Sequence, residues 1–331
     1  MVLSSFKLGE SLVMREFPDP IPSATQVRVS VRAIGVNPVD WKMRTYGPLR
    51  LAAQLLRWVG ISKGPLIIGV DFSGVVDAVG HEVSEFKIGD RVVGGCDFSN
   101  GLPGSYADTV IVNAKQITHL PAHIPFDIGG ALPVVGVTAW LSVVEMGQIS
   151  AGKRLLLLGA AGGVGQFCIQ VAKNIHNAFV VAVCSTKNLE RVRHLGADVA
   201  IDYTQGDALL QARQYGPFDC IIDAVGDYSG SACRSMLVPG GKHIMVSADK
   251  IPSMLQIFIP PFSSRIVLAK PTGKRLKPVL EAVSSAQVHV EIAERMPLKD
   301  AEQAHELSKT HRVAGKIVLQ CDPIIPQNQE L

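Results

Sequence analysis

Two patterns of hydrophobic positions follow one another along the chain. From Met1 to about Leu120, short runs of alternating apolar and polar residues are broken by Gly, Pro and Asp, as around Gln26–Ile34, which is typical of strands joined by turns. From about Pro121 onward, apolar runs of strand length alternate with segments of helical spacing. These runs are Leu155–Leu158, Phe179–Cys184, Val199–Tyr203, Cys220–Val225, Lys242–Val246 and Arg265–Ala269. This order predicts an α/β fold with a parallel, doubly wound sheet.

The end of the chain returns to the first pattern and closes with an apolar run, Lys316–Gln320. We therefore predict a β-rich domain formed by residues 1–121 and 290–331, with the doubly wound domain of residues 122–289 between its two parts. One helical stripe in the first domain stands apart, at Pro48–Gly60. We interpret this segment in three alternative ways: as a surface helix packed on its own domain, as a lid over a pocket, or as a membrane-surface contact.

The run Leu155–Leu158 leads into small residues and then into a helical pattern that begins near Gln166. A strand, a tight turn and a helix N-terminus let backbone N–H groups and the helix dipole meet a pyrophosphate, because glycines carry no Cβ to block it. An ordinary strand–loop–helix connection is the alternative, since a glycine-rich turn alone is a weak signal. The candidate cofactor-binding residues of the turn are Ala161, Gly162, Gly163, Val164 and Gly165.

Composition narrows the classes of function. The 331 residues are 47% hydrophobic and 18% charged, with a net charge of +3, which is typical of a globular protein in water and gives no reason to expect nucleic acid. No apolar window reaches the length of a membrane span, and the first residues do not resemble a secretory signal. The six cysteines are scattered without a Cys-x-x-Cys pair. They predict neither disulfides nor zinc and favour a reducing compartment, the cytoplasm.

The residues after the second strand of the sheet bear on the choice of cofactor. An acidic residue there would bind a ribose 2′-hydroxyl, but Phe179–Cys184 is followed by Ser185, Thr186 and Lys187. Hydroxyls and an ammonium suit a 2′-phosphate, so we predict NADPH in preference to NADH; a polar loop with a solvated lysine is the alternative. Tyr203, at the end of the third strand, is a candidate to lie near the adenine or this phosphate, or it is a plain strand-end tyrosine.

Several motifs along the chain resemble one family. The glycine turn, together with Gly152, Lys153, Gln170 and Lys173, resembles the signature of the quinone oxidoreductase/zeta-crystallin family, in the zinc-free branch of the medium-chain dehydrogenases/reductases. The other motifs are Gly35–Lys42, which resembles plant chloroplast-envelope quinone oxidoreductase homologues, Gly104–Asp108, Leu132–Ala139 and Ala314–Val318. The resemblance covers nearly the whole chain. It implies a GroES-like catalytic domain, formed from both termini, with a Rossmann domain inserted in it.

The resemblance also implies roles for single residues. Hydride would pass from NADPH to a quinone, or to the C=C bond of an α,β-unsaturated carbonyl. Asn37 would contact the nicotinamide ribose, Thr138 would lie beside the nicotinamide, and Asp40 would order the same loop as Asn37. Tyr46 is the candidate hydrogen-bond donor or proton source, with a plain turn tyrosine, and water as the proton source, as alternatives. Lys316 is a further candidate for cofactor binding.

Backbone groups at Val225 and Val246, at the ends of the fourth and fifth strands, would border the ribose and nicotinamide. Two other functions stay open: an enoyl-thioester reductase, and an NADPH-binding protein with a structural or regulatory role and little turnover. A homodimer is implied only by the resemblance.

Zinc is not expected. By the resemblance, zinc-dependent relatives supply a cysteine where Asp40 stands and Gly-His-Glu where Gly69–Asp71 stands. The Gly-His-Glu at Gly80–Glu82 falls in a turn after a strand, and we interpret it as coincidental. With neither thiolate nor imidazole at the expected positions, no metal site is predicted. Conjugate reduction tolerates the loss of a Lewis acid, because an enone delocalises the developing charge.

Overall fold

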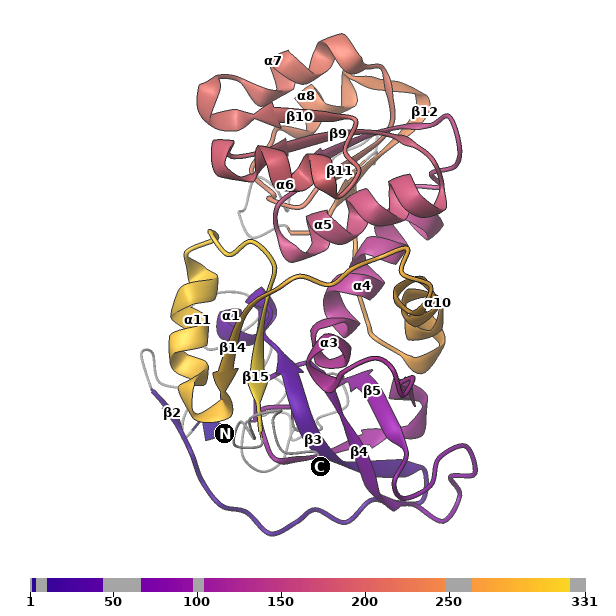
Figure 1. Ribbon diagram of the computed structural model, residues 1–331, viewed down its shortest axis with the longest axis vertical. Coiled ribbons are helices and arrows are strands. Elements are labelled where there is room, and N and C mark those ends of the chain that lie inside the picture. Colours follow the sequence, from indigo (N-terminus) through magenta and orange to yellow (C-terminus); the bar gives the residue numbers. More distant parts are fainter. Residues whose placement is uncertain (1, 4–10, 44–66, 98–103, 248–263, 322–331) are drawn as a thin grey trace, which may run out of the picture. The chain divides into compact units, whose positions relative to one another are not determined.

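The computed structural model describes residues 2–3, 11–43, 67–97, 104–247 and 264–321. The chain divides into two compact units, which are described separately (Figure 1). The first unit comprises Met1–Val134, Lys270–Ser284 and Ile292–Leu331, and the second comprises Val135–Ala269 and Ser285–Glu291. Tyr46 and the stripe Pro48–Gly60 lie outside the described residues.

A seven-stranded sheet forms the first unit. The strands β14, β15, β3, β4, β5 and β7 follow one another, and β6 pairs with β3. Side chains of β3 (Gln26–Gly35) alternate between partly exposed and buried along most of its length, because successive residues of a strand face opposite sides. The remaining bounds are β1 Val2–Leu3, β2 Leu12–Val13, β4 Asp71–Val79, β5 Arg91–Gly95, β6 Thr109–Asn113, β7 Ile117–His119, β14 Ile292–Pro297 and β15 Lys316–Gln320.

The last strand confirms the predicted return of the chain, since β15 pairs antiparallel with β3. The described residues of this unit include four α-helices, α1 (Pro38–Lys42), α3 (Phe126–Ala131), α10 (Gly273–Ser284) and α11 (Ala301–Lys309). α1 follows β3 directly and contacts α11, although the two helices lie at opposite ends of the sequence. This contact is visible in Figure 1, where the indigo and yellow helices are neighbours.

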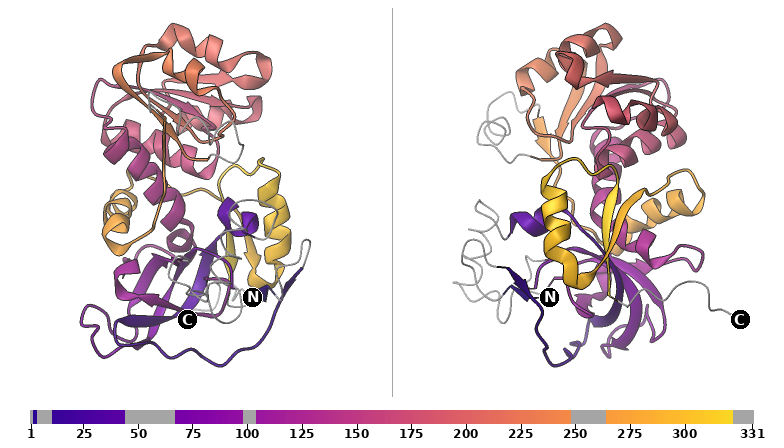
Figure 2. Two further views of the ribbon diagram at one scale, coloured as in Figure 1. Left: turned by 180° about the vertical axis from the view of Figure 1, so that it is seen from behind. Right: turned by 60° about the vertical axis from the view of Figure 1, so that its left-hand side comes forward.

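The second unit is the predicted doubly wound domain. Its six strands are all parallel, in the order β10-β9-β8-β11-β12-β13, and helices lie on both faces of the sheet (Figures 1 and 2). The strands are β8 Arg154–Leu158, β9 Phe179–Cys184, β10 Val199–Asp202, β11 Phe218–Asp223, β12 Leu237–Met245 and β13 Ser264–Ile266. Where this unit is described, its α-helices are α5 Gly163–Gln170, α6 Leu189–His194, α7 Ala208–Ala212 and α8 Gly230–Arg234; α4 (Pro133–Trp140) crosses the boundary between the units.

The core of the second unit explains why its first strand is a continuous apolar run. The four residues Leu155–Leu158 are fully buried, because a central parallel strand is covered on both faces and has no solvent side to carry polar residues. In the part of the chain that the structure describes, no helix is long and apolar enough to cross a membrane.

The division into units differs from the predicted domain boundaries in two places. Residues 122–134 and Lys270–Ser284 lie with the first unit, whereas the sequence pattern put them in the doubly wound domain. α3 packs on β3 and β4, and α10 packs on β7. Both helices thus cover the β-rich sheet even though they adjoin the other domain in sequence. The exact boundaries of the two domains stay a prediction.

Candidate active site

The chain turns from β3 into α1 at Asn37, which is the N-cap of that helix. The backbone N–H of Asn37 donates to Asp40 Oδ2 at 2.7 Å, as in one half of a capping box. Pro38 fills the first helical position, where no N–H is needed. The sequence Asn-Pro-Val-Asp therefore folds locally and brings Asn37 and Asp40 together.

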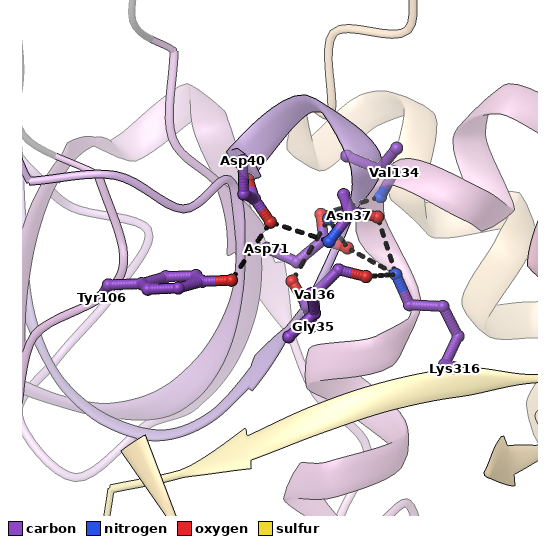
Figure 3. A network of polar contacts seen from close by, with 8 residues as sticks. All are labelled: Gly35, Val36, Asn37, Asp40, Asp71, Tyr106, Val134 and Lys316. Atoms are coloured by element: carbon purple, nitrogen blue, oxygen red, sulfur yellow. Dashed lines mark hydrogen bonds and ion pairs between the residues drawn. The ribbon is translucent and has the colours of Figure 1, made fainter. Parts of the chain in front are cut away.

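The side chain of Asn37 is held by buried polar groups (Figure 3). Its Nδ2 donates to Asp71 Oδ2 at 2.9 Å and to the carbonyl oxygen of Gly35 at 3.2 Å. Its Oδ1 accepts from Lys316 Nζ at 2.7 Å. Because an amide has two N–H donors and two oxygen lone pairs, these three contacts with described residues use both donors and leave one lone pair of Asn37. It can accept a hydrogen bond from a sugar hydroxyl, but it cannot donate one.

Lys316 and Asp71 form the charged part of this cluster. Lys316 Nζ donates to the carbonyl oxygen of Val36 at 3.0 Å and lies 3.6 Å from Asp71 Oδ2. Asp71 Oδ1 accepts from the backbone N–H of Val134 at 2.9 Å. Burial raises the pKa of Asp71 to about 6, although Lys316 opposes the rise, and burial lowers the pKa of Lys316. The pair fixes the orientation of Asn37.

Asp40 is the least satisfied member of the cluster. Its Oδ2 also faces the hydroxyl of Tyr106 at 3.4 Å, which in turn lies 3.0 Å from His305 Nε2. Its Oδ1 is buried without a partner among the described residues. Burial is the main cause that raises the pKa of Asp40 to about 7, and the charge of Asp71 adds to it. Near neutral pH a proton on Asp40 would leave one carboxylate against one ammonium, so the cluster would be close to neutral.

Asp40 and Asp71 of the cluster stand at the two positions where, by the family resemblance, zinc-dependent relatives carry ligands. Both oxygens of Asp71 accept N–H bonds, and the ammonium of Lys316 faces one of them, so a cation would be repelled there. Within the described ranges, no three His, Cys, Asp or Glu side chains gather as metal ligands would. Chemistry without zinc stays a prediction.

The glycine turn of the second unit fits a pyrophosphate. Gly159 takes a φ of +82°, and α5 follows Gly162, its N-cap, with no side chain capping it. A Cβ at Gly165 would lie 2.5 Å from the carbonyl oxygen of Gly159, whereas one at Gly162 would meet nothing closer than 3.6 Å. Uncapped N–H groups and the helix dipole favour an anion. The five predicted residues of this site, 161–165, lie in the turn or at the start of α5.

The loop after the second strand holds a group that the sequence analysis missed. Ser185, Thr186 and Lys187 follow β9, the last two in a 3-10 turn. Thr186 Oγ1 donates to Asp202 Oδ2 at 2.5 Å. The sequence pattern has no acid at the end of the second strand, but this carboxylate reaches the same loop from the end of the third, β10. Such a contact between neighbouring strands leaves no local signal in the sequence.

The other predicted cofactor residues lie at the carboxyl ends of their strands. Tyr203 follows β10 and is half exposed, and Val246 follows β12. Val225 is in the turn after β11, where Asp223 Oδ1 accepts from the N–H groups of Val225 at 2.9 Å and of Gly226 at 2.8 Å. Burial raises the pKa of Asp223. Asp223, also missed from sequence, therefore fixes the loop that carries Val225.

Two predicted catalytic residues are not joined to the buried cluster by the described contacts. Thr138 is buried in α4, and its carbonyl oxygen accepts from the hydroxyl of Ser142 at 2.7 Å. It belongs to the second unit, whereas Asn37 and Asp40 belong to the first. Tyr46 lies outside the described residues. The structure thus brings together Asn37, Asp40 and Lys316, and the roles of all five residues stay predictions.

Comparison with known proteins gives matches along most of the chain. Residues 23–122 match the model of the alcohol dehydrogenase GroES-like domain, and residues 195–319 match the model described as zinc-binding dehydrogenase. A zinc-type alcohol dehydrogenase-like protein of Schizosaccharomyces pombe is 30% identical over 311 residues, which cover 89% of this chain and 87% of the relative. The human mitochondrial NAD(P)H oxidoreductase RTN4IP1 is 40% identical over 209 residues, 61% of this chain and 52% of the relative. The match thus spans about half the length of that relative.

Among solved structures, the quinone oxidoreductase of Coxiella burnetii superimposes with a TM-score of 0.83 at 28% identity, over 92% of this chain and 93% of the other. The fold defines the class of proteins that join a GroES-like domain to a dinucleotide-binding domain. Within that class, the chain belongs to the quinone oxidoreductase family of the medium-chain dehydrogenases/reductases, as the motifs predicted.

Proposed function

We propose that the chain is an NADPH-dependent reductase that transfers hydride, without zinc, to quinones or to the C=C bond of α,β-unsaturated carbonyls. The observation that carries the proposal is the buried cluster of Asn37, Asp40, Asp71 and Lys316, in which Asp40 and Asp71 stand where, by the family resemblance, zinc-dependent relatives carry ligands. This cluster can hold a ribose hydroxyl, but it supplies no Lewis acid. Acceptors that spread the developing charge by conjugation need none.

When bound, NADPH supplies the hydride, and the chain binds, orients and shields the reactants. Backbone N–H groups at the start of α5 would hold the pyrophosphate. Asn37 would accept a hydrogen bond from the nicotinamide ribose, and Thr138 would lie beside the nicotinamide. Tyr46 or water donates the proton that completes the reduction. Lys316 is bonded to Asn37 and buried, so it acts through Asn37 as a positioning residue.

The preference for NADPH rests on Lys187, whose ammonium complements a 2′-phosphate. Lys187→Ala is expected to raise the dissociation constant of NADPH about tenfold, since a hydrogen bond to a charged group contributes ~1.5 kcal/mol or more, and to leave that of NADH almost unchanged. Lys153→Ala is the matched control. Lys153 precedes β8, at the amino ends of the strands, whereas Lys187 follows the carboxyl end of β9; Lys153 pairs with Asp219. Equal losses for both nucleotides in Lys187→Ala would overturn the assignment.

Screening of acceptors tests the function itself. NADPH oxidation is measured with quinones, alkenals and enones of graded chain length, and with enoyl thioesters. We expect turnover with quinones or enones and little with thioesters. Turnover confined to thioesters would redirect the proposal to an enoyl-thioester reductase, and nucleotide binding without turnover would favour a structural or regulatory role.

Compartment and assembly belong to the same proposal. The sequence favours the cytoplasm, whereas the human relative is named as mitochondrial. Fractionation of cells that express the tagged full chain decides between these. We propose a homodimer, as the family resemblance implies, which light scattering of the purified chain tests.

A further inference from the structure

A carboxylate stands beside the residues proposed to bind the 2′-phosphate. Asp202 Oδ2 accepts from the hydroxyl of Thr186 at 2.5 Å, and Oδ1 accepts from the hydroxyl of Thr204 at 2.7 Å. The backbone N–H of Thr204 also donates to Oδ1, at 2.9 Å. These bonds, the one from Thr186 first, lower the pKa of Asp202. The group is therefore an ionised carboxylate at neutral pH.

The hydroxyl proton of Thr186 is committed to this carboxylate. A threonine hydroxyl has one proton to donate and two lone pairs that accept. Thr204 gives its own proton to the same group, so the 2.9 Å contact between the two hydroxyl oxygens leaves no further donor. Thr186 can thus offer a ligand only its lone pairs. These accept a hydrogen bond from a ribose hydroxyl, whereas a phosphate requires donors.

The carboxylate of Asp202 lies at the carboxyl edge of the sheet, where dinucleotide-binding folds bind the ribose. β9 and β10 are parallel, and Asp202 stands opposite Cys184, the last residue of β9. In dinucleotide-binding folds an acid at the end of the second strand binds the ribose 2′-hydroxyl. Here the acid reaches the loop after that strand from the neighbouring strand, with Thr186 between.

We infer that Asp202 is a specificity-determining residue that opposes binding of a 2′-phosphate, so that NADH binds this chain alongside NADPH. The inference rests on the proposed function, because it places a dinucleotide at this edge. Lys187 attracts the phosphate, while Asp202 repels it and withdraws the proton of Thr186. A unit charge within a few ångströms of a phosphate that carries nearly two charges weakens its binding about tenfold, even in a water-like dielectric.

Substitution of Asp202→Asn removes the charge and keeps the shape. The new amide can donate to the oxygen of Thr186, which frees the hydroxyl proton for the phosphate. Binding to the purified full chain is followed by the fluorescence of the reduced nicotinamide. We expect the dissociation constant of NADPH to fall about tenfold and that of NADH to stay the same or rise.

Asp198→Asn is the matched control. Asp198 precedes the same strand at its other end and accepts from the backbone N–H of Val180 at 2.8 Å, a bond that an amide oxygen retains. This control should leave the ratio of the two dissociation constants unchanged. An unchanged ratio in Asp202→Asn, equal weakening of both nucleotides, or the same shift in both variants would overturn the inference. A shifted ratio without reduction of any quinone or enone would instead contradict the proposed function alone.

Discussion

At the scale of single residues, the buried cluster shows how much of a side chain's chemistry depends on distant parts of the chain. The family resemblance implied that Asp40 orders the loop of Asn37, and the structure shows the N–H of Asn37 donating to Asp40 Oδ2 at 2.7 Å; the role itself stays a prediction. It did not predict Tyr106 or His305, which lie 199 positions apart in the sequence and meet through a 3.0 Å contact. The available signal was weak: a histidine on the buried face of α11 is usually a core residue.

The raised pKa values of Asp40 and Asp71 predict how stability depends on pH. From pH ~4 to pH ~7, the folded chain keeps protons on these carboxyls that the unfolded chain has lost, because their pKa values rise from 3.8 to about 7 and about 6. The free energy of unfolding therefore falls as the pH rises through this window. Asp40→Asn should reduce this fall by on the order of 2 kcal/mol.

Urea unfolding at pH 4.5 and pH 7.5 measures the difference between the wild type and the variant. Asp90→Asn is the control, because the pKa of Asp90 is shifted in the opposite direction: a hydrogen bond from the N–H of Lys87 lowers it. That carboxylate contributes stability that is lost only as the pH falls below about 4, so its removal should leave the difference between pH 4.5 and pH 7.5 almost unchanged. An Asp40 variant with the same pH dependence as the wild type would contradict the assigned pKa.

At the scale of elements, the strand–turn–helix around β8 and α5 was predictable, because its signal is local: an apolar run, glycines and a helical period. Gly162 and Gly165 nonetheless have different roles, and these roles can be distinguished only in the structure. A Cβ at Gly165 would lie within 2.7 Å of two carbonyl oxygens, while one at Gly162 has room. Gly165 is therefore needed for packing of the helix, and Gly162 is available for the ligand.

A pair of alanine substitutions tests this distinction. Gly165→Ala should destabilise the fold by about 1–3 kcal/mol, because backbone must move to admit the methyl group. Gly162→Ala should change stability by less than about 1 kcal/mol and still weaken NADPH, because its methyl group lies where the pyrophosphate approaches. Thermal unfolding and nucleotide titration report the two effects. A destabilised Gly162 variant, or one with unchanged affinity, would contradict this division.

At the scale of the whole molecule, the order of strands predicted both units, because alternating strands and helices have few ways to fold. The return of β15 to β3 was also predicted. The placement of Lys270–Ser284 with the first unit was not, since an amphipathic helix does not show in its own sequence which sheet it will cover. The contact of Asp202 was not predicted for a related reason: its partner Thr186 follows a neighbouring strand.

The central claim is hydride transfer from NADPH without zinc, and activity of the metal-stripped chain tests it most directly. The full chain is treated exhaustively with a chelator, its metal content is measured by mass spectrometry, and NADPH oxidation is followed with a quinone and an enone. We expect full activity with zinc far below one ion per chain, because Asp71 and Lys316 already satisfy each other where a ligand would stand. Activity that disappears with the metal and returns only with zinc would contradict the claim.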